Sequence, residues 1–385
     1  MSTQDNSKKT INHHLIGESG SVAQLATPAL IIQKDVFDAN VKAMKEHCAR
    51  NGLALRPHAK THKSISIAQA QIEAGALGVC CAKLGEAEVM SAGGIDSILI
   101  TSPIITAQAV ARLMALNART SDLMVVVDHP ENVETLAAAA MAAGKPLSVL
   151  IDLDIGLHRT GIAPGEGALE LAQGIARQDS LSFKGLQAYA GHLMHIDDFE
   201  GRRKKSLEGM QHLAIMRDGL KELGIECPII SGGGTGTYNI DPEAKVLTEL
   251  QGGSYIFMDR QYNSILGPQD TPPLFEASLF VQMTVVSKNT PGIVTTDAGF
   301  KSFATDAEEP PQLVAGAPEG ANYFFFGDEQ GGIFLPDGED LALGHVLTAL
   351  TPHCDPTVNL YDVYHVVEGD TLIDIWPIEA RGCSS

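Results

Sequence analysis

Short apolar segments alternate with helix-like segments over more than half of this 385-residue chain, and this alternation constrains its fold more than any other feature. The apolar segments contain many β-branched residues, are bounded by glycine or proline, and are each followed by a stretch with helical periodicity. They comprise residues 53–55, 78–82, 97–101, 123–127, 147–153, 183–189 and 228–231, with 253–258 as an eighth candidate. Strands joined by helical crossovers form parallel sheets. The pattern predicts an α/β fold with a (β/α)8 TIM-like barrel, and a doubly wound open sheet is the alternative.

The pattern changes near Gly267, after which the helical periodicity fades. Strand-like runs follow at 277–287, 292–296 and 372–376, and residues 310–318 are predicted to form a proline-bounded loop. The length of the chain exceeds what one hydrophobic core usually supports. We therefore expect a polar N-terminal segment at 1–27, a barrel domain at 28–265 and a C-terminal β-domain at 266–385.

The charge and the cysteine pattern argue against several classes of protein. The formal net charge is -20, whereas nucleic acids and anionic membranes need a basic surface on their partner. Residues 1–20 show no signal-peptide pattern and no apolar run reaches membrane-spanning length, so a cytoplasmic location is expected. The six cysteines are scattered without a CxxC pair, which predicts reduced thiols rather than disulfides or structural zinc.

Lys60 is a candidate catalytic residue because it follows an apolar strand within the segment RPHAKTHK at 56–63. A lysine amine forms a Schiff base with an aldehyde cofactor, and burial or neighbouring cations lower the lysine pKa enough to leave a nucleophilic amine. His58, His62 and Lys63 are neighbours of Lys60 in the sequence. The segment therefore predicts covalent chemistry at Lys60, and a solvated basic turn is the alternative.

Two glycine-rich runs follow late strands, SGGGTGTY at 231–238 and GGSY at 252–255. Glycines allow successive backbone N–H groups to converge on an anion. In (β/α)8 barrels the phosphate site commonly lies after the seventh and eighth strands. Neither run matches the P-loop pattern, so the sequence favours a monophosphate cofactor over a nucleoside triphosphate. A mobile loop is the alternative interpretation.

His353 and Asp355 flank Cys354 and form a candidate metal pair. On an extended segment, the first and third side chains point to the same face and can share one ion. An imidazole and a carboxylate, with water completing the shell, suit Mn²⁺, Mg²⁺, Co²⁺ or Zn²⁺. A His-x-Asp triplet also occurs by chance, so this prediction depends on the presence of the other motifs.

Two further segments at predicted strand ends contain candidate residues. In YAGHLMH at 189–195, His192 and His195 are interpreted as two catalytic bases, as two metal ligands or as loop histidines without a function. In DIGLHRTG at 154–161, Arg159 could contact a cofactor phenolate oxygen or form a salt bridge at a helix start. Barrel chemistry collects at the carboxyl ends of the strands, which is where all of these segments fall.

These segments, together with GSYIFMD at 253–259 and HCDPT at 353–357, resemble the D-threonine aldolase and D-serine dehydratase family. That family consists of pyridoxal-phosphate enzymes with the alanine racemase fold, also called fold type III, and the similarity runs from about residue 27 to 382. The resemblance implies an N-terminal (β/α)8 barrel and a C-terminal β-domain that also takes up the first strand, 28–33. It further implies a homodimer whose site lies at the domain interface.

The resemblance also implies roles for individual residues. Lys60 matches the Schiff-base lysine, His195 a histidine of the aldolases, and Tyr189 a residue that lines the cofactor ring. Arg159 matches the arginine near the phenolic oxygen. The residues that match the phosphate pocket are Thr235, Gly236, Gly253, Ser254 and Tyr255, and those that match the metal pair are His353 and Asp355.

The metal pair separates the two activities of the family, because dehydratases tend to show His-x-Cys and aldolases His-x-Asp. The resemblance therefore implies retro-aldol cleavage of a D-3-hydroxy amino acid of the D-threonine type to glycine and an aldehyde, with pyridoxal 5'-phosphate and a divalent metal ion. The alternatives are a 3-hydroxy-D-aspartate aldolase giving glycine and glyoxylate, a D-serine or D-3-hydroxyaspartate dehydratase, and a non-catalytic pyridoxal-phosphate carrier. A second substrate carboxylate would need an extra cation, for which Arg260, Lys301 and Arg381 are candidates.

Overall fold

The computed structural model describes residues 11–385. Residues 1–10 of the expected polar segment lie outside the described residues, and the segment continues with the short 3-10 helices η2 (His13–Leu15) and η3 (Ser21–Gln24). No helix within 11–385 is both long and apolar enough to cross a membrane.

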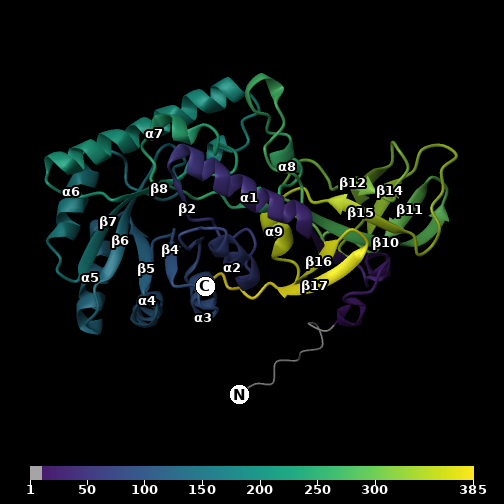
Figure 1. Ribbon diagram of the computed structural model, residues 1–385, viewed down its shortest axis with the longest axis horizontal. Helices are drawn as coiled ribbons and strands as arrows, with labels where there is room; N and C mark the ends of the chain where they lie inside the picture. Colours follow the sequence, from purple (N-terminus) through teal and green to yellow (C-terminus); the bar gives the residue numbers. More distant parts are fainter. Residues whose placement is uncertain (1–10) are drawn as a thin grey trace, which may run out of the picture.

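Eight parallel strands form the larger domain and confirm the predicted barrel class (Figure 1). Their order around the sheet is β2-β9-β8-β7-β6-β5-β4-β3. Backbone bonds complete the circle between β2 and β3, from Leu77 N to Leu55 O (2.8 Å) and from Cys80 N to Pro57 O (2.9 Å). The strands are β2 (Ala54–Leu55), β3 (Val79–Cys81), β4 (Ser97–Ile100), β5 (Asp122–Val127), β6 (Leu147–Leu153), β7 (Leu181–Ala188), β8 (Ile229–Gly232) and β9 (Glu249–Leu250).

Helices cover the outside of the barrel and bury one face against it, as the strand–helix alternation predicts. In α4, for example, the buried residues Val110, Leu113 and Leu116 recur at helical spacing and face the sheet. The helices are α1 (Lys34–Asn51), α2 (Ile65–Glu73), α3 (Leu84–Ala92), α4 (Ala107–Arg119), α5 (Pro130–Ala143), α6 (Glu166–Ala176) and α7 (Phe199–Glu222).

The eighth strand lies elsewhere than predicted. Residues 253–258 contain the 3-10 helix η6 (Ser254–Ile256), and the eighth strand is β9, which is only two residues long. The apolar residues of 253–258 are buried because they pack in the core, not because they pair in a sheet. The prediction of a strand at 253–258 is therefore wrong.

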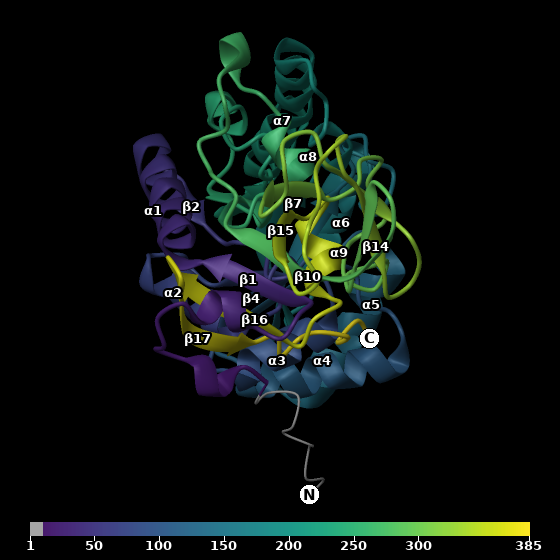
Figure 2. The same ribbon diagram turned by 90° about the vertical axis from the view of Figure 1, so that its right-hand side faces the viewer.

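The remaining strands form a nine-stranded sheet that lies beside the barrel (Figures 1 and 2). Strand β1 (Ala29–Gln33) lies in this sheet, antiparallel to β10 and parallel to β16, although it precedes the barrel in the sequence. Two short helices complete the C-terminal part, α8 (Arg260–Asn263) and α9 (Cys354–Val358). The strands after β1 are β10 (Leu279–Thr290), β11 (Ile293–Thr296), β12 (Gln312–Ala315), β13 (Asn322–Phe325), β14 (Gly331–Phe334), β15 (Val346–Leu350), β16 (Val363–Glu368) and β17 (Thr371–Pro377).

The predicted loop at 310–318 contains a strand, β12, which pairs with β15. The two prolines at 310 and 311 precede the first strand residue, a position where the missing N–H group costs no ladder bond. The loop prediction is therefore wrong for residues 312–315.

Arg56 and Glu249 form an ion pair buried within the barrel. Arg56 Nε donates to Glu249 Oε1 at 2.9 Å, and both side chains are 3% exposed. Arg56 Nη1 also donates to Ser97 Oγ at 2.8 Å. The guanidinium that the sequence places near Lys60 is thus neutralised by its own carboxylate, between β2 and β9.

We expect Glu249→Ala to lower the free energy of unfolding by about 3–5 kcal/mol, because it leaves a buried guanidinium without a partner. The matched control is Glu243→Ala, since the Arg203–Glu243 pair is 39% exposed on both sides and exposed pairs contribute about 0–1 kcal/mol. Urea denaturation of both variants measures the difference. Equal losses for the two variants would contradict the structural role of the buried pair.

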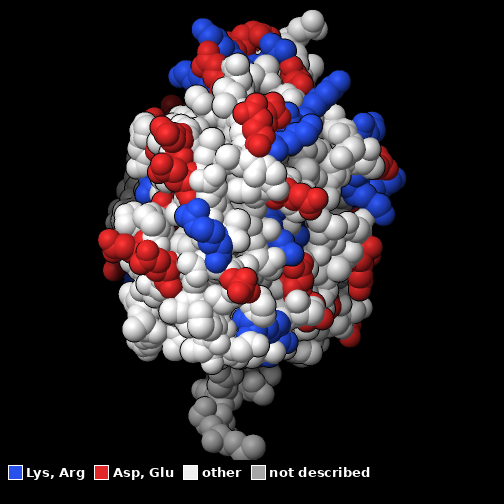
Figure 3. Space-filling model, turned by 90° about the vertical axis from the view of Figure 1, so that its left-hand side faces the viewer, with Lys and Arg blue, Asp and Glu red and all other residues white. Residues whose placement is uncertain are grey.

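The outer face of the barrel near α5 and α6 shows interspersed charges (Figure 3). Lys and Arg side chains alternate with Asp and Glu side chains over this face, and the described residues that are visible there form no continuous basic area. This distribution differs from the basic stripe that nucleic-acid-binding proteins present to phosphates.

Candidate active site

A cavity of about 590 Å³ lies at the mouth of the barrel, at the carboxyl ends of the strands. This is the end at which barrel enzymes place their chemistry. Six residues predicted from the sequence line this cavity: Lys60, Arg159, Tyr189, Thr235, Gly253 and Ser254. His58, Lys83, Gln187 and Gln251 line it as well.

Lys60 of the barrel forms an ion pair with Asp355 of the β-domain, so the two domains meet at this amine. Backbone bonds from Ala59 N to Cys80 O (2.8 Å) and from Lys63 N to Ala59 O (2.7 Å) hold the turn that contains Lys60. Burial opposes the charged amine, but the Asp355 carboxylate outweighs burial and raises the pKa of Lys60. The expected lowering of the Lys60 pKa is therefore wrong.

The basic neighbours of Lys60 in the sequence do not lower its pKa because they are compensated or neutral. Lys63 is buried and forms an ion pair with Glu86. Burial lowers the pKa of His58 to about 3, with a smaller contribution from the charge of Lys60. Burial likewise lowers the pKa of His62 to about 3. Both imidazoles are therefore neutral at physiological pH.

Contacts to the Asp355 carboxylate and to the backbone of the preceding residue hold the start of α9. The Asp355 carboxylate accepts from Lys60 and, at 3.4 Å, from Ser254 Oγ. Cys354 N, one residue earlier, donates to Asp259 Oδ2 at 2.8 Å, and Asp259 is fully buried. Burial opposes the ionisation of Asp355, but Lys60 and His353 outweigh burial and lower its pKa far below the usual range.

The segment that contains His353 and Asp355 is not extended. His353 is the residue before the helix α9, and Asp355 lies in the first turn of that helix. The argument that alternate residues of an extended segment face one side therefore does not apply here. They lie near each other because they are two positions apart at the start of α9, where the charge of His353 also lowers the pKa of Asp355.

His353 and His195 lie close together with Asp306. His353 Nδ1 contacts Asp306 Oδ2 at 2.7 Å, which leaves Nε2 available. Burial lowers the pKa of His195, and the charge of His353 lowers it further while Asp306 opposes this. The His195 ring also lies 5.0 Å from the Tyr262 ring, centroid to centroid. Within residues 11–385, no group of three or more His, Cys, Asp or Glu side chains is arranged to hold a metal ion.

Two of the predicted phosphate residues are glycines against which other parts of the chain pack too closely for a side chain. A Cβ atom at Gly253 would lie 2.5 Å from Thr61 Oγ1, and one at Gly236 would collide with the backbone of Met194. Thr235 Oγ1 accepts from Tyr255 N at 3.1 Å, which ties the two glycine-rich runs together. Tyr255 itself lies outside the cavity, because its ring is fully buried and its hydroxyl accepts from Gln71 at 2.9 Å.

Arg159 and Tyr189 form a second wall of the cavity. The Arg159 guanidinium carbon lies 5.6 Å from the centroid of the Tyr189 ring, a distance at which a cation and an aromatic ring attract each other. Burial raises the pKa of Tyr189, and the positive charge of Lys60 opposes this. The phenol is therefore neutral beside Lys60. Both histidines of this segment, His192 and His195, are exposed.

Three cations considered for a second substrate carboxylate already have partners. Arg260 Nη2 bonds Glu309 at 2.7 Å, Lys301 Nζ bonds Glu329 at 2.5 Å, and Arg381 Nε pairs with Asp362 at 3.2 Å. Lys83 lines the cavity and has no ion-pair partner within residues 11–385.

Several residues of the site were missed by the sequence prediction. Asp306, Gln187 and Gln251 belong to no recognisable motif, and their positions follow only from the folded chain. Asp259 ends a segment that the sequence did single out, and its place after a glycine-rich run was the available signal. Arg202 is buried and donates to the carbonyls of Ile196 and Leu266, which fixes the segment that follows His195.

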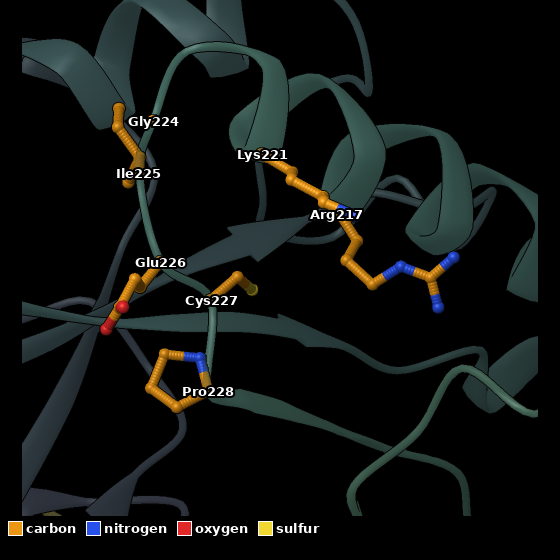
Figure 4. Close-up of a pocket in the computed structure, with 7 residues that line it drawn as sticks. All are labelled: Arg217, Lys221, Gly224, Ile225, Glu226, Cys227 and Pro228. Carbon is orange, nitrogen blue, oxygen red and sulfur yellow. The ribbon is translucent and has the colours of Figure 1, made fainter.

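A second cavity of about 430 Å³ lies away from this site (Figure 4). It is formed by the last turn of α7 and the segment that enters β8, and is therefore at the opposite end of β8 from the glycine-rich run. Cys227 in its wall is half-buried, and burial raises the pKa of the thiol to about 11. This cavity offers no activated nucleophile.

Comparison with known proteins agrees with this geometry. The family model described as alanine racemase, N-terminal domain, matches residues 32–261, and the model described as putative serine dehydratase domain matches residues 278–367. A barrel with a lysine at its mouth and an adjoining β-domain defines the class of alanine racemase-like enzymes.

The matching proteins narrow this class. D-threonine aldolase from Arthrobacter sp is 40% identical over 94% of each chain, and 3-hydroxy-D-aspartate aldolase from Paracoccus denitrificans (strain Pd 1222) is 34% identical over 94% of this chain and 93% of its own. The crystal structure of D-threonine aldolase from Filomicrobium marinum matches with a TM-score of 0.89 and 36% identity, over 94% of this chain and 97% of the other. The chain belongs to the D-threonine aldolase and D-serine dehydratase family.

Proposed function

We propose that this protein is a pyridoxal-phosphate- and divalent-metal-dependent aldolase that cleaves D-3-hydroxy amino acids of the D-threonine type to glycine and an aldehyde. The main structural support is the contact between Lys60 of the barrel and Asp355 of the β-domain in the mouth of the barrel. That contact places an amine suited to cofactor attachment beside a carboxylate suited to ion binding. The family relationship supports the same reaction type.

The residues present fit pyridoxal phosphate. The cavity of about 590 Å³ is lined by Lys60 and by residues of both glycine-rich runs, and the missing side chain at Gly253 lets its run pack against the turn that contains Lys60. Lys60 is the residue that holds the aldehyde, Arg159 and Tyr189 flank the ring, and Thr235, Gly236, Gly253 and Ser254 hold the phosphate. Tyr255 supports the phosphate pocket from behind, through its N–H bond to Thr235. When bound, pyridoxal phosphate supplies a sink for the electrons of a breaking bond at Cα.

The residues present also fit a divalent ion held by two protein ligands and water. The donor set is the imidazole of His353 and the carboxylate of Asp355, which suits Mn²⁺, Mg²⁺, Co²⁺ or Zn²⁺. The Asp306 contact at His353 Nδ1 orients the ring, as an outer carboxylate commonly does for a ligand histidine. When bound, a divalent ion lowers the pKa of a hydroxyl group that it contacts.

The chain's own residues perform the proton transfers. His195 has a lowered pKa and lies near His353, so its neutral ring accepts the proton of the substrate β-hydroxyl. As Cα–Cβ breaks, the carbon that bears the hydroxyl becomes the aldehyde carbonyl. Cα then takes up a proton and leaves as glycine. Lys60 Nζ, which lies in the cavity beside Asp355, would supply that proton.

The charges of the site favour a neutral group on Cβ. Arg260, Lys301 and Arg381 are already paired, and Arg159 is assigned to the cofactor. Lys83 remains for the single α-carboxylate of the substrate. D-Threonine therefore fits the site better than 3-hydroxy-D-aspartate. The family resemblance further supports a homodimer.

We expect the purified protein, loaded with pyridoxal phosphate and Mn²⁺, to convert D-threonine to equimolar glycine and acetaldehyde. D-Serine and 3-hydroxy-D-aspartate are assayed in parallel, with ammonia, keto acids and glyoxylate measured as products. We expect a chelator to abolish the cleavage and Mn²⁺ to restore it. Release of ammonia instead of glycine would establish a dehydratase, and no turnover of any substrate would support a non-catalytic carrier.

A further inference from the structure

A buried polar relay lies beneath the cavity, between Asp152 in β6, Gln187 in β7 and Gln251 just after β9. Gln187 Nε2 donates to Asp152 Oδ1 at 3.0 Å. Gln251 Nε2 donates to Gln187 Oε1 at 3.2 Å and to Ser231 Oγ at 2.8 Å. Asp152, Gln187 and Gln251 are at most 4% exposed, and the two glutamines line the cavity. The proposed mechanism assigns no role to these residues.

The Asp152 carboxylate fixes the orientation of both amides. Burial raises the pKa of Asp152 to about 6, opposed by its bonds from Gln187 and Thr160, so the group is ionised at and above neutral pH and only accepts. Gln187 must therefore present its NH₂ group to Asp152 and its oxygen to Gln251. Gln251 must in turn present its NH₂ group to Gln187. The reverse orientation would place two acceptors against each other.

The carbonyl oxygen of Gln251 is thereby left for the cavity. Both N–H bonds of its amide are used by Gln187 and Ser231. Within residues 11–385 the Gln251 oxygen has no hydrogen-bond partner, and it is not among the enclosed polar atoms that lack one. The relay thus presents one uncharged acceptor to whatever occupies the cavity.

We propose that Gln251 contacts the cofactor and accepts a hydrogen bond from the protonated ring nitrogen of pyridoxal phosphate, an inference that rests on the proposed function. In the pyridoxal ring, the nitrogen is para to the carbon that bears the aldehyde, and the phosphate arm and phenolic oxygen flank that carbon. With the aldehyde at Lys60 and the phosphate at Thr235 and Gly253, the nitrogen faces away from Asp355, toward the barrel interior. The amide of Gln251 lines the cavity and is bonded to Gln187 of β7 and Ser231 of β8, inside the barrel.

This acceptor favours a proton on the ring nitrogen. A donor at the same position, such as a guanidinium, would favour the unprotonated ring, whereas an amide oxygen can only accept. The protonated ring withdraws electrons more strongly than the neutral ring. Gln251 thus tunes the electronics of the cofactor through a hydrogen bond to its ring nitrogen.

The test is ¹⁵N NMR of the holoenzyme reconstituted with pyridoxal phosphate that is ¹⁵N-labelled at the ring nitrogen. We expect the wild-type resonance at the position of a protonated ring, and Gln251→Leu to move it toward that of unprotonated pyridine. Asp152→Asn, which removes the requirement for one amide orientation, gives a smaller shift in the same direction. The control Gln282→Leu removes a buried glutamine of β10, outside the cavity, and leaves the resonance unchanged.

The outcomes separate this inference from the proposed function. An unprotonated nitrogen in wild-type protein that binds the cofactor and cleaves D-threonine overturns the role of Gln251 alone. An unchanged resonance in Gln251→Leu overturns it as well. Wild-type protein that binds no pyridoxal phosphate overturns the proposed function and this inference together. Where Gln251→Leu does not fold, Gln251→Met and Asp152→Asn provide the same comparison.

Discussion

Lys60→Ala is expected to remove the visible absorbance band of the bound cofactor and to lower kcat/KM for D-threonine by about 10⁴-fold or more, a loss typical of removing a covalent catalyst. Lys60 is the lysine that lines the cavity at the meeting point of the two domains. Alanine removes both the covalent link to the aldehyde and the amine nearest the reacting carbon. Absorbance spectra of the reconstituted variant and steady-state kinetics measure the two losses.

Lys60→Arg is the matched control, because arginine keeps the positive charge beside Asp355 but forms no stable link with an aldehyde. We expect it to fold like the wild type and to lose the absorbance band and the activity as Lys60→Ala does. An absorbance band that persists in both variants would refute the assignment of Lys60. A band that persists in Lys60→Ala alone would point to another lysine, of which Lys83 lines the same cavity.

The barrel class was predictable from the sequence because seven of its strands are apolar runs separated by helices. The eighth was not, since β9 has two residues and one of them is Glu249. A charged residue in a strand is unexpected unless its partner is known, and Arg56 is 193 positions away in the sequence. The apolar run at 253–258 resembled a strand more than residues 249–250 did, because a buried segment and a strand give similar local patterns of apolar residues.

The electrostatics of the site were less predictable than its position. The end of β2 placed Lys60 at the barrel mouth, but its partner Asp355 is 295 positions away. Sequence neighbours suggested a lowered pKa, whereas the folded chain pairs those neighbours elsewhere and gives Lys60 a carboxylate. Local sequence therefore indicates which residue types are available, and only the fold decides which charges meet.

The positioning residues were the least predictable part of the site. Asp306 contributes through one contact, to His353 Nδ1, and Gln251 through two amide hydrogen bonds, to Gln187 and Ser231. None of these contacts depends on spacing along the chain, so no motif indicates them. The role of Asp259 was partly predictable. It lies in a segment that the sequence singled out, but it accepts a hydrogen bond from Cys354 N, 95 positions away in the sequence.

Asp355→Asn is expected to abolish tight Mn²⁺ binding and to lower kcat/KM for D-threonine by about 100-fold or more, because removing even an outer partner of a metal ligand typically costs about 10–100-fold. The asparagine keeps the shape of the side chain and its place at the start of α9. It removes the negative charge that faces Lys60 and that would face the ion. Electron paramagnetic resonance of free and bound Mn²⁺ gives the affinity, and kinetics at increasing Mn²⁺ gives the activation.

Asp340→Asn is the control for this substitution, since Asp340 is a carboxylate of the same domain that pairs with Lys288 and is 67% exposed. We expect it to bind Mn²⁺ and to cleave D-threonine as the wild type does. Because Asp355 also pairs with Lys60, Mn²⁺ binding and activity report on different contacts of this carboxylate. Lost activity with unchanged Mn²⁺ binding would leave Asp355 as a partner of Lys60 and place the ion elsewhere, and unchanged activity in the presence of a chelator would show that the reaction needs no ion.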